Sequence, residues 1–277
     1  MGELPVPFLE LNDGNLIPQL GLGVWRLPAE DTERVVSEAL ELGYRHFDTA
    51  RIYDNEAAVG RALAASGLPR EELFVTTKLW NTDQEDPHGA FEASLDRLGL
   101  EKVDLYLVHW PVPQRKTAVG AWRGLVEIVG SNQCDSIGVS NFEIAHLNEL
   151  ISETGVVPAV NQVELHPLHQ RRELRAFCAE RGIAVEAWGP LSQGKSDLLE
   201  RPETVAAAAA HGKTPAQVVI RWHLQHGTVV FPKTSSRERL AENADVFDFE
   251  LTSAEMASID AMDEQRNFGP DPASFNE

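Results

Sequence analysis

The sequence predicts a single α/β domain in the form of a (β/α)8 barrel, and three observations lead to this fold class. Short apolar segments rich in Val, Ile, Leu and Phe alternate with segments of helical periodicity along nearly the whole chain. Eight such apolar segments are present, and their almost continuous apolar character is typical of a parallel sheet covered by helices. The length of 277 residues fits one barrel, and no linker divides residues 1–277 into two domains.

A β-hairpin with its turn at Asp13-Gly14 comes first, and we expect it to close the bottom of the barrel. The apolar segments follow as barrel strands, at residues 19–24, 45–49, 73–79, 104–110, 136–140, 159–164, 184–188 and 228–233. Helical periodicity fills intervals between them, at residues 31–43, 55–67, 87–100, 171–182, 204–212 and 214–227. Several of these helical segments end in the glycine that commonly follows a helix C-terminus.

The C-terminal part of the chain contains one more helix start and an irregular end. Ser235 and Glu238 have the spacing of a capping box and predict a helix that begins there. Residues 265–277 contain two prolines and one glycine and show no periodicity. We therefore expect a tail that either is free or folds over one mouth of the barrel.

The composition argues against several classes of protein. The chain has 43 acidic and 24 basic residues, and its net charge of −19 makes nucleic acid and anionic membranes unfavourable partners. No apolar run approaches the roughly 18–20 residues of a membrane span, and the first residues lack an export signal, so we expect a cytoplasmic protein. Cys134 and Cys178 lack metal-ligand spacing, so no metal site is predicted. An anionic ligand would require a local cluster of cations.

Common nucleotide-binding and hydrolase motifs are absent from the sequence. The chain has no G-x-G-x-x-G after a strand, no P-loop, no G-x-S-x-G elbow and no H-E-x-x-H. The segment "GLGVWR" begins like a dinucleotide fingerprint and then departs from it. If a dinucleotide binds, it is therefore not held in the manner of a Rossmann domain.

Polar side chains stand at the C-terminal end of nearly every predicted strand. In a (β/α)8 barrel these ends converge on one mouth, where active sites are built. Each residue alone has a structural explanation, such as a helix cap for Asp48, a neutralised core lysine for Lys78 or a hydrogen-bonded core histidine for His109. Their common position favours a functional site. The set comprises Asp48, Lys78, His109, Ser140, Asn141, Gln162, Trp188 and Lys233.

Tyr53 lies in the loop after the second strand and is the predicted general acid. We expect Asp48 to keep a buried Lys78 charged, so that Lys78 is a fixed cation near Tyr53. Lowering the tyrosine pKa of about 10 by about two units requires about 2.7 kcal/mol. A cation at about 4 Å supplies about 4 kcal/mol at an effective dielectric constant of about 20. His109 would then orient a substrate oxygen by hydrogen bonding.

The predicted partner of this acid is a nicotinamide dinucleotide. Lys233, Arg237 and Arg239 accompany a helix N-terminus after the last strand, which favours binding of an anion, although a solvated surface helix would have the same pattern. Trp188 offers a flat face for a planar ring. A carboxamide would be matched by the donors and acceptors of Ser140, Asn141 and Gln162.

These motifs resemble the aldo-keto reductase superfamily over essentially the whole chain. The similar segments are "GLGVWR", "GYRHFDTARIYDNEAAVG", "VTTKLW", "VDLYLVHWP", "SIGVSNF", "PAVNQVELHP", "EAWGPLSQGK" and "VVFPKTSSRERLAEN". Within the superfamily, "AWGPLSQGK", "TPAQVVIRWHLQ" and "ADVFDFEL" are most similar to bacterial 2,5-diketo-D-gluconate reductases. The chain departs from the family pattern at Val24, where many relatives have Thr, and at Ser236, where diketogluconate reductases tend to have Arg. The segment "VGSNQCDSIGVSNF" also lacks the usual basic residue before its strand.

The resemblance implies a monomeric, NADPH-dependent reductase of aldehydes, α-dicarbonyls or keto-sugar acids. It implies Tyr53 as general acid, Lys78 and Asp48 as the pair that lowers its pKa, and His109 as the residue that orients the carbonyl. The implied cofactor contacts are Ser140, Asn141, Gln162, Trp188, Gly189, Leu191, Gln193, Lys233, Thr234, Ser235, Arg239 and Asn243. The implied substrate pocket is formed by Trp25, Trp80, His109 and Trp110, with Phe268 as a lid.

Three alternatives stay open from the sequence. The three pocket tryptophans have packing at the barrel rim as their structural explanation. The same barrel also serves some relatives as a cofactor-binding structural or redox-sensing subunit. An NAD-linked alcohol dehydrogenase would differ in cofactor and in direction of reaction.

Overall fold

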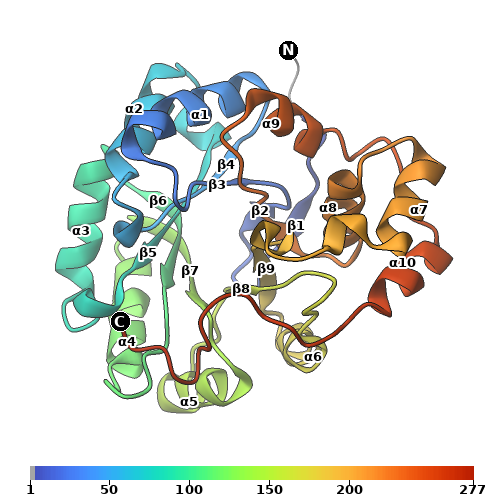
Figure 1. Cartoon of the computed structure of the whole chain (residues 1–277). Helices are drawn as coiled ribbons and strands as arrows, with labels where there is room; N and C mark the ends of the chain where they lie inside the picture. Colours follow the sequence, from blue (N-terminus) through green and yellow to red (C-terminus); the bar gives the residue numbers. More distant parts are fainter. Residues whose placement is uncertain (1–3) are drawn as a thin grey trace.

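Eight parallel strands form the central sheet of the computed structural model, which describes residues 4–277 (Figure 1). Their order in the sheet follows the sequence, and a parallel bridge between Leu20 and Val230 joins the first strand to the last. The predicted barrel is therefore confirmed. The strands are β3 (Leu22–Gly23), β4 (His46–Asp48), β5 (Phe74–Leu79), β6 (Val103–Val108), β7 (Cys134–Ser140), β8 (Val160–Glu164), β9 (Ala184–Trp188) and β10 (Val229–Val230).

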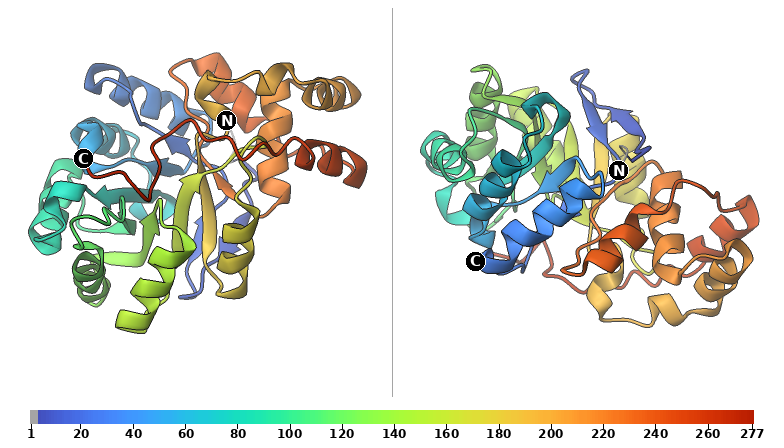
Figure 2. Two further views of the ribbon diagram at one scale, coloured as in Figure 1. Left: turned by 60° about the horizontal axis from the view of Figure 1, so that its bottom comes forward. Right: turned by 90° about the horizontal axis from the view of Figure 1, so that it is seen from above.

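Residues 4–277 form ten helices, and Figure 2 shows helices along the outer side of this sheet. All helical segments expected from the sequence form helices, and α4, α5 and α10 are further helices. The largest apolar cluster, which includes Trp122 and Tyr106, packs between helices and sheet. The helices are α1 (Ala29–Glu41), α2 (Glu56–Ala65), α3 (Pro87–Leu98), α4 (Ala118–Val129), α5 (Ile144–Thr154), α6 (Arg172–Glu180), α7 (Pro202–His211), α8 (Pro215–Gln225), α9 (Arg237–Ala244) and α10 (Ser253–Asp260).

The start of α9 differs from the predicted capping box. Ser236, rather than Ser235, is the N-cap, and its hydroxyl oxygen accepts a hydrogen bond from the Arg239 backbone N–H at 3.3 Å. The Glu238 carboxylate accepts a hydrogen bond from the Ser236 hydroxyl at 2.6 Å instead of reaching back to the backbone. The predicted box of Ser235 and Glu238 is therefore wrong, because the helix begins one residue later than the spacing indicated.

The N-terminal hairpin closes the bottom of the barrel, as predicted. Its strands β1 (Phe8–Glu10) and β2 (Leu16–Pro18) pair antiparallel, with Leu9 opposite Ile17. Ile17 belongs to a second apolar cluster inside the barrel, together with Leu105 and Val229. The hairpin thereby buries apolar surface that the short strands alone would leave open to water.

The C-terminal tail folds over the mouth of the barrel, which is the second of the two predicted alternatives. In Figure 1 it runs in red from α10 past β8 to the C-terminus. The backbone N–H groups of Phe268 and Gly269 donate to the Glu164 carboxylate at 2.7 and 2.9 Å. Near the end of the chain, the Asn81 side-chain amide donates to the Glu277 backbone carbonyl at 2.6 Å. The tail is thus fixed at both its middle and its end.

Two negative findings apply to residues 4–277. No helix in this part of the chain is long and apolar enough to cross a membrane. The same residues include no group of three or more His, Cys, Asp or Glu side chains that could hold a metal ion. Cys134 and Cys178 are buried free thiols.

Candidate active site

Asp48 and Lys78 form a buried ion pair at the mouth of the barrel. Asp48 ends β4, and Lys78 stands near the end of the neighbouring strand β5. The Lys78 Nζ lies 2.7 Å from both Asp48 carboxylate oxygens and 2.8 Å from the Thr49 carbonyl oxygen. These three bonds use all three donors of the ammonium group.

The Lys78 side chain is fully buried, and its partners decide its charge. Burial by itself would lower the pKa of Lys78, but Asp48, followed by Tyr53, more than compensates and raises that pKa above its ordinary value. Lys78 is therefore a permanent cation at neutral pH. Because its hydrogen bonds are complete, it is also fixed in position.

Tyr53 lies in a short 3-10 helix, Arg51–Tyr53, directly after β4. The Lys78 Nζ is 5.1 Å from the centroid of its ring. Burial raises the pKa of Tyr53 to about 12, and Lys78 opposes this rise. The pKa of Tyr53 is therefore raised, whereas the sequence predicted that it is lowered. The prediction included the attraction between Lys78 and the phenolate but left out the free-energy cost of burying a phenolate.

His109 follows β6 and packs edge-to-face against Tyr53, with ring centroids 5.7 Å apart. Its side chain is buried, and burial, followed by the positive charge of Lys78, holds the pKa of His109 well below its ordinary value. His109 is therefore a neutral imidazole at pH 7. A neutral imidazole donates from one ring nitrogen, which suits it to hydrogen-bond a carbonyl oxygen.

Gln162 connects this group to a residue that the sequence did not reveal. The Gln162 side-chain nitrogen donates to Asp48 at 2.9 Å and to Glu186 at 2.8 Å. Glu186 stands two residues before Trp188 in the apolar strand β9 and is fully buried. The sequence did contain a signal for Glu186. An acidic residue stands in an otherwise apolar strand, two positions before the predicted site residue Trp188, so both side chains point to the same face of the sheet.

The four residues predicted to hold a nicotinamide lie at the ends of three adjacent strands. The Trp188 indole N–H donates to the Asn141 side-chain oxygen at 2.8 Å, and the Ser140 hydroxyl donates to the Gln162 backbone carbonyl at 2.9 Å. Both amide hydrogens of Gln162 are engaged, by the side-chain oxygens of Asp48 and Glu186. Its side-chain oxygen accepts no hydrogen bond from the described residues, so this oxygen is the group that Gln162 offers to a carboxamide.

The residues predicted to contact the cofactor phosphates lie in the loop after β9 and around the start of α9. Gly189 and Gln193 have the left-handed φ values of 61° and 56°, which turn the loop away from β9. Lys233 and Arg239 are exposed and form no ion pair within residues 4–277. Arg237, by contrast, is paired with Glu41 at 2.6 Å. The cation cluster inferred from the sequence thus has two free members and one neutralised member.

The remaining predicted contacts lie in the same two segments. Leu191 is in the loop after β9, Thr234 and Asn243 are buried, and Ser235 is exposed beside them. The Thr234 hydroxyl accepts a hydrogen bond from the Ser236 backbone N–H at 3.1 Å, which fixes the turn before α9. Thr234 and Ser235 follow Lys233 directly in the chain, so hydroxyl groups and a cation stand together in sequence before α9, and these are group types that bind phosphate.

Aromatic side chains enclose the space in front of His109. The Trp80 and Trp110 ring centroids lie 5.1 and 6.5 Å from that of His109, and Trp25, which is 39% exposed, stacks with Arg26. The structure thus brings Trp80 and Trp110 together with His109. Trp25 has no ring contact with them.

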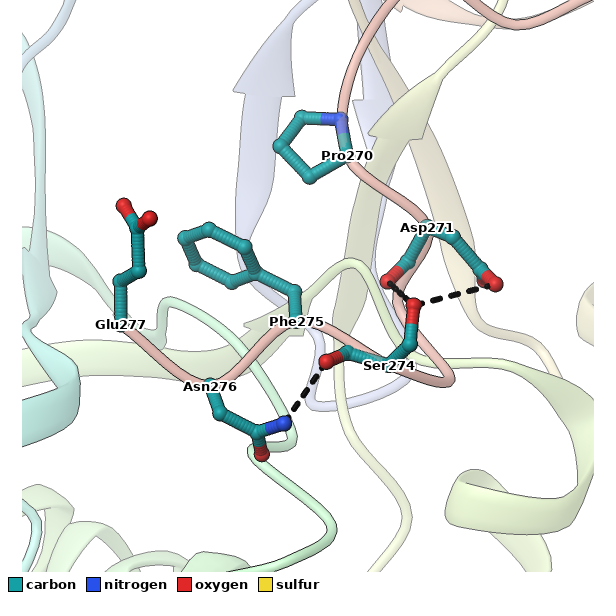
Figure 3. A pocket seen from close by; sticks show the side chains of 6 residues that line it. All are labelled: Pro270, Asp271, Ser274, Phe275, Asn276 and Glu277. Atoms are coloured by element: carbon teal, nitrogen blue, oxygen red, sulfur yellow. Dashed lines mark hydrogen bonds between the residues drawn. The ribbon is translucent and has the colours of Figure 1, made fainter.

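Phe275, rather than Phe268, is the tail residue at this pocket. The Phe275 ring centroid lies 4.4 Å from that of Trp110. Figure 3 shows Phe275 among the tail residues that line a hollow of about 370 Å³, which is formed by the tail alone and includes neither Trp110 nor His109 in its lining. Phe268 packs instead against His166 at 5.4 Å. Glu164 holds the Phe268 backbone at the end of β8, which keeps its side chain away from the tryptophans.

The family model "Aldo/keto reductase family" matches residues 19–264, which is most of the chain. The chain belongs to the aldo/keto reductase family. An aldo-keto reductase of Mycolicibacterium smegmatis is 54% identical, with 98% of each chain covered. A methylglyoxal reductase DkgA of Yersinia pestis is 51% identical, with 97% of each chain covered.

Solved structures of aldo/keto reductases share the fold along almost the full length. The crystal structure of a Gox0644 mutant in complex with NADPH has a TM-score of 0.93 and 46% identity, and 98% of each chain is covered. A Bombyx mori aldo-keto reductase in complex with NADP has a TM-score of 0.89 and 35% identity, with 95% of this chain and 94% of that chain covered. The fold class and family expected from the sequence are thus confirmed.

Proposed function

We propose that this aldo/keto reductase is a single-domain, monomeric and cytoplasmic enzyme that reduces aldehydes, α-dicarbonyls or keto-sugar acids with NADPH. Relatives named methylglyoxal reductase and structural neighbours in complex with NADPH or NADP support the activity and the cofactor. The buried pair of Lys78 and Asp48 beside Tyr53 is the observation that carries the proposal. A general acid next to a permanent buried cation can release a proton and leave a stabilised phenolate.

The residues present fit a bound NADPH, which would supply the hydride. Trp188 presents a partly exposed indole at the end of β9, and the Gln162 side-chain oxygen faces no protein donor within residues 4–277. Together with Ser140 and Asn141 they would hold the nicotinamide end. Gly189, Leu191 and Gln193 would line the pyrophosphate. The phosphate at the adenosine end would be bound by the exposed side chains of Lys233, Ser235 and Arg239 and by the buried polar side chains of Thr234 and Asn243.

The proton donor is the Tyr53 hydroxyl. His109, as a neutral imidazole, donates a hydrogen bond to the substrate carbonyl oxygen and orients it toward Tyr53. As negative charge develops on that oxygen, the Tyr53 proton moves to it. Lys78 then stabilises the Tyr53 phenolate, which burial alone would disfavour. Trp80, Trp110 and Phe275 exclude water from this transfer.

Replacement of Tyr53 by Phe tests the mechanism. We expect Tyr53→Phe to lower kcat for methylglyoxal by about 10²–10⁴-fold, the usual contribution of a positioned general acid. NADPH binding, measured by isothermal titration calorimetry, should remain because the hydroxyl is not among the proposed cofactor contacts. Tyr44→Phe is the matched control for turnover, since Tyr44 is also a buried tyrosine and its hydroxyl donates to the Leu240 backbone carbonyl. Undiminished turnover by Tyr53→Phe would contradict the proposal.

A panel of carbonyl compounds tests the substrate class. Absorbance of the nicotinamide should report turnover with methylglyoxal, 2,5-diketo-D-gluconate or aromatic aldehydes. The same assay with NADH in place of NADPH separates this enzyme from an NAD-linked alcohol dehydrogenase. Cofactor binding without turnover of any of these carbonyls would favour a structural or redox-sensing subunit.

A further inference from the structure

Glu186 is a buried acid without a cationic partner. Its side chain is fully buried on β9, where it stands between Gln162 on β8 and Val229 on β10 in the strand register. One carboxyl oxygen accepts the hydrogen bond from Gln162, and the other has no hydrogen-bond partner. Within residues 4–277 no Lys, Arg or His forms an ion pair with it.

These surroundings favour the neutral form of the Glu186 side chain. An ionised carboxylate with a single hydrogen bond in a closed interior is far more costly than a carboxylic acid in the same place. Burial, with a further contribution from Asp48, raises the pKa of Glu186 to about 8, although Gln162 and Lys78 oppose the rise. At pH 7 Glu186 is therefore mainly protonated.

The Gln162 side chain connects Glu186 to the Asp48–Lys78 pair by hydrogen bonds. The Gln162 nitrogen has two hydrogens, of which one binds Asp48 and the other binds Glu186. Asp48 on β4 and Lys78 on β5 are the charged groups that act on Glu186, while Val229 on β10 is apolar. The orientation of the Gln162 amide is thus set by two acids, only one of which is permanently paired with a cation.

We propose that Glu186 is a positioning residue that, as a neutral acid, holds the Gln162 amide against Asp48 and leaves the Asp48–Lys78 pair electrically balanced beneath Tyr53. This inference rests on the proposed role of Tyr53 as general acid. When Glu186 loses its proton, a second negative charge joins the cluster. That charge strengthens the hold of Tyr53 on its proton, so Tyr53 becomes a weaker acid and reduction slows in the alkaline range.

Infrared spectroscopy tests the protonation of Glu186 without any need for turnover. In the pH-difference spectrum of the wild-type enzyme between pH 6.5 and 9.5, the carbonyl stretch of a buried carboxylic acid should disappear at the higher pH. Glu186→Gln should lack this band. The wild-type spectrum needs no variant, so it stands even if Glu186→Gln does not fold. A wild-type spectrum without a carboxylic acid band at pH 6.5 would overturn the proposal.

The pH profile of carbonyl reduction tests the coupling to Tyr53. With each profile normalised to its own value at pH 6.5, the wild-type kcat should fall through an alkaline step near pH 8. In Glu186→Gln, which has no carboxyl group to titrate, we expect no step near pH 8, so that any alkaline fall begins at higher pH. Glu56→Gln is the matched control, because Glu56 is buried but paired with Arg97. It should keep the wild-type step.

An alkaline step at the same pH in wild type and Glu186→Gln would overturn the coupling. Absence of NADPH-dependent reduction in the wild-type enzyme would instead contradict the proposed function, and the infrared result would still decide the protonation of Glu186. The two failures are therefore distinguishable.

Discussion

The charges around Lys78 and the charges around Lys233 both belong to the proposed site, but they are held in different ways. Lys78 is fully buried, has all three donors bonded and is matched by Asp48. Lys233 and Arg239 are exposed and have no acidic partner within residues 4–277. The first cluster is fixed before any ligand arrives, whereas the second keeps its cations free for one. In the proposed function, the buried cluster therefore serves the proton transfer and the exposed cluster the choice of cofactor.

The largest effect is expected from removal of the buried cation. Lys78→Met should lower kcat by at least about 10³-fold, because Tyr53 loses the charge that stabilises its phenolate. The buried Asp48 would then be unpaired, which costs about 3–5 kcal/mol of unfolding free energy. Steady-state kinetics and urea denaturation measure the two effects.

A double variant separates these two consequences. Lys78→Met with Asp48→Asn removes both charges, so much of the unfolding free energy should return while turnover stays low. Recovery of turnover along with stability would show that Lys78 acts only on the fold. The comparison between the clusters would then lose its basis.

A smaller effect is expected from the exposed cluster. Lys233→Ala with Arg239→Ala should raise the Kd for NADPH by about 10- to 100-fold, since a hydrogen bond contributes about 0.5–1.5 kcal/mol net and two are lost at an exposed site. The Kd for NADH and the unfolding free energy should change little, because exposed charges contribute little to stability. Calorimetric titration at two salt concentrations measures the Kd values.

Arg237→Ala is the matched control for the exposed cluster. Arg237 is on the same helix but is paired with Glu41, so its loss should leave the Kd for NADPH nearly unchanged. If Arg237→Ala weakens NADPH binding as much as the double variant does, a general change in surface charge would explain both results.

The smallest effect is expected at the tail. The Glu164 carboxylate accepts two backbone N–H groups of the tail, and a carbon added at Gly269 would collide with the Trp188 ring. Glu164→Gln replaces one acceptor by a donor, so we expect a looser tail and a KM for carbonyl substrates higher by about 3- to 10-fold. Limited proteolysis after residue 264 provides a second measurement. An unchanged KM and cleavage rate would contradict this role.

The same contact predicts a pH dependence of the tail. Burial would raise the pKa of Glu164, but hydrogen bonds from His166, Gly269 and Phe268 lower it below its ordinary value of 4.5. The stabilisation by a carboxylate with a lowered pKa is present above the ordinary value and is lost as pH falls through the folded-state pKa. Proteolysis of the tail should therefore accelerate below about pH 4.5 in wild type. In Glu164→Gln, whose amide does not titrate, it should not.

The sequence by itself determined the eight barrel strands, most of the helices and the position of most of the proposed site. Apolar periodicity located all eight strands, because burial against helices requires that pattern locally. In a parallel barrel the ends of the strands meet, so Asp48, Lys78 and His109 were expected to lie together without knowledge of any contact. Asp48 and Lys78 pair because they carry opposite charges on adjacent strands.

Tertiary structure decided what depends on burial and on contacts distant in sequence. The pKa of Tyr53 is raised because desolvation outweighs Lys78, and the sequence gives no measure of desolvation. Phe275 replaces Phe268 at the pocket because Glu164, about a hundred residues earlier in the chain, holds the tail. Glu186 belongs to the site because β8 and β9 are neighbours in the sheet, and their register places Glu186 beside Gln162. The local sequence pattern determines where a side chain lies in its helix or strand. The packing of other elements determines its exposure to solvent and its hydrogen-bond partners, and therefore its charge.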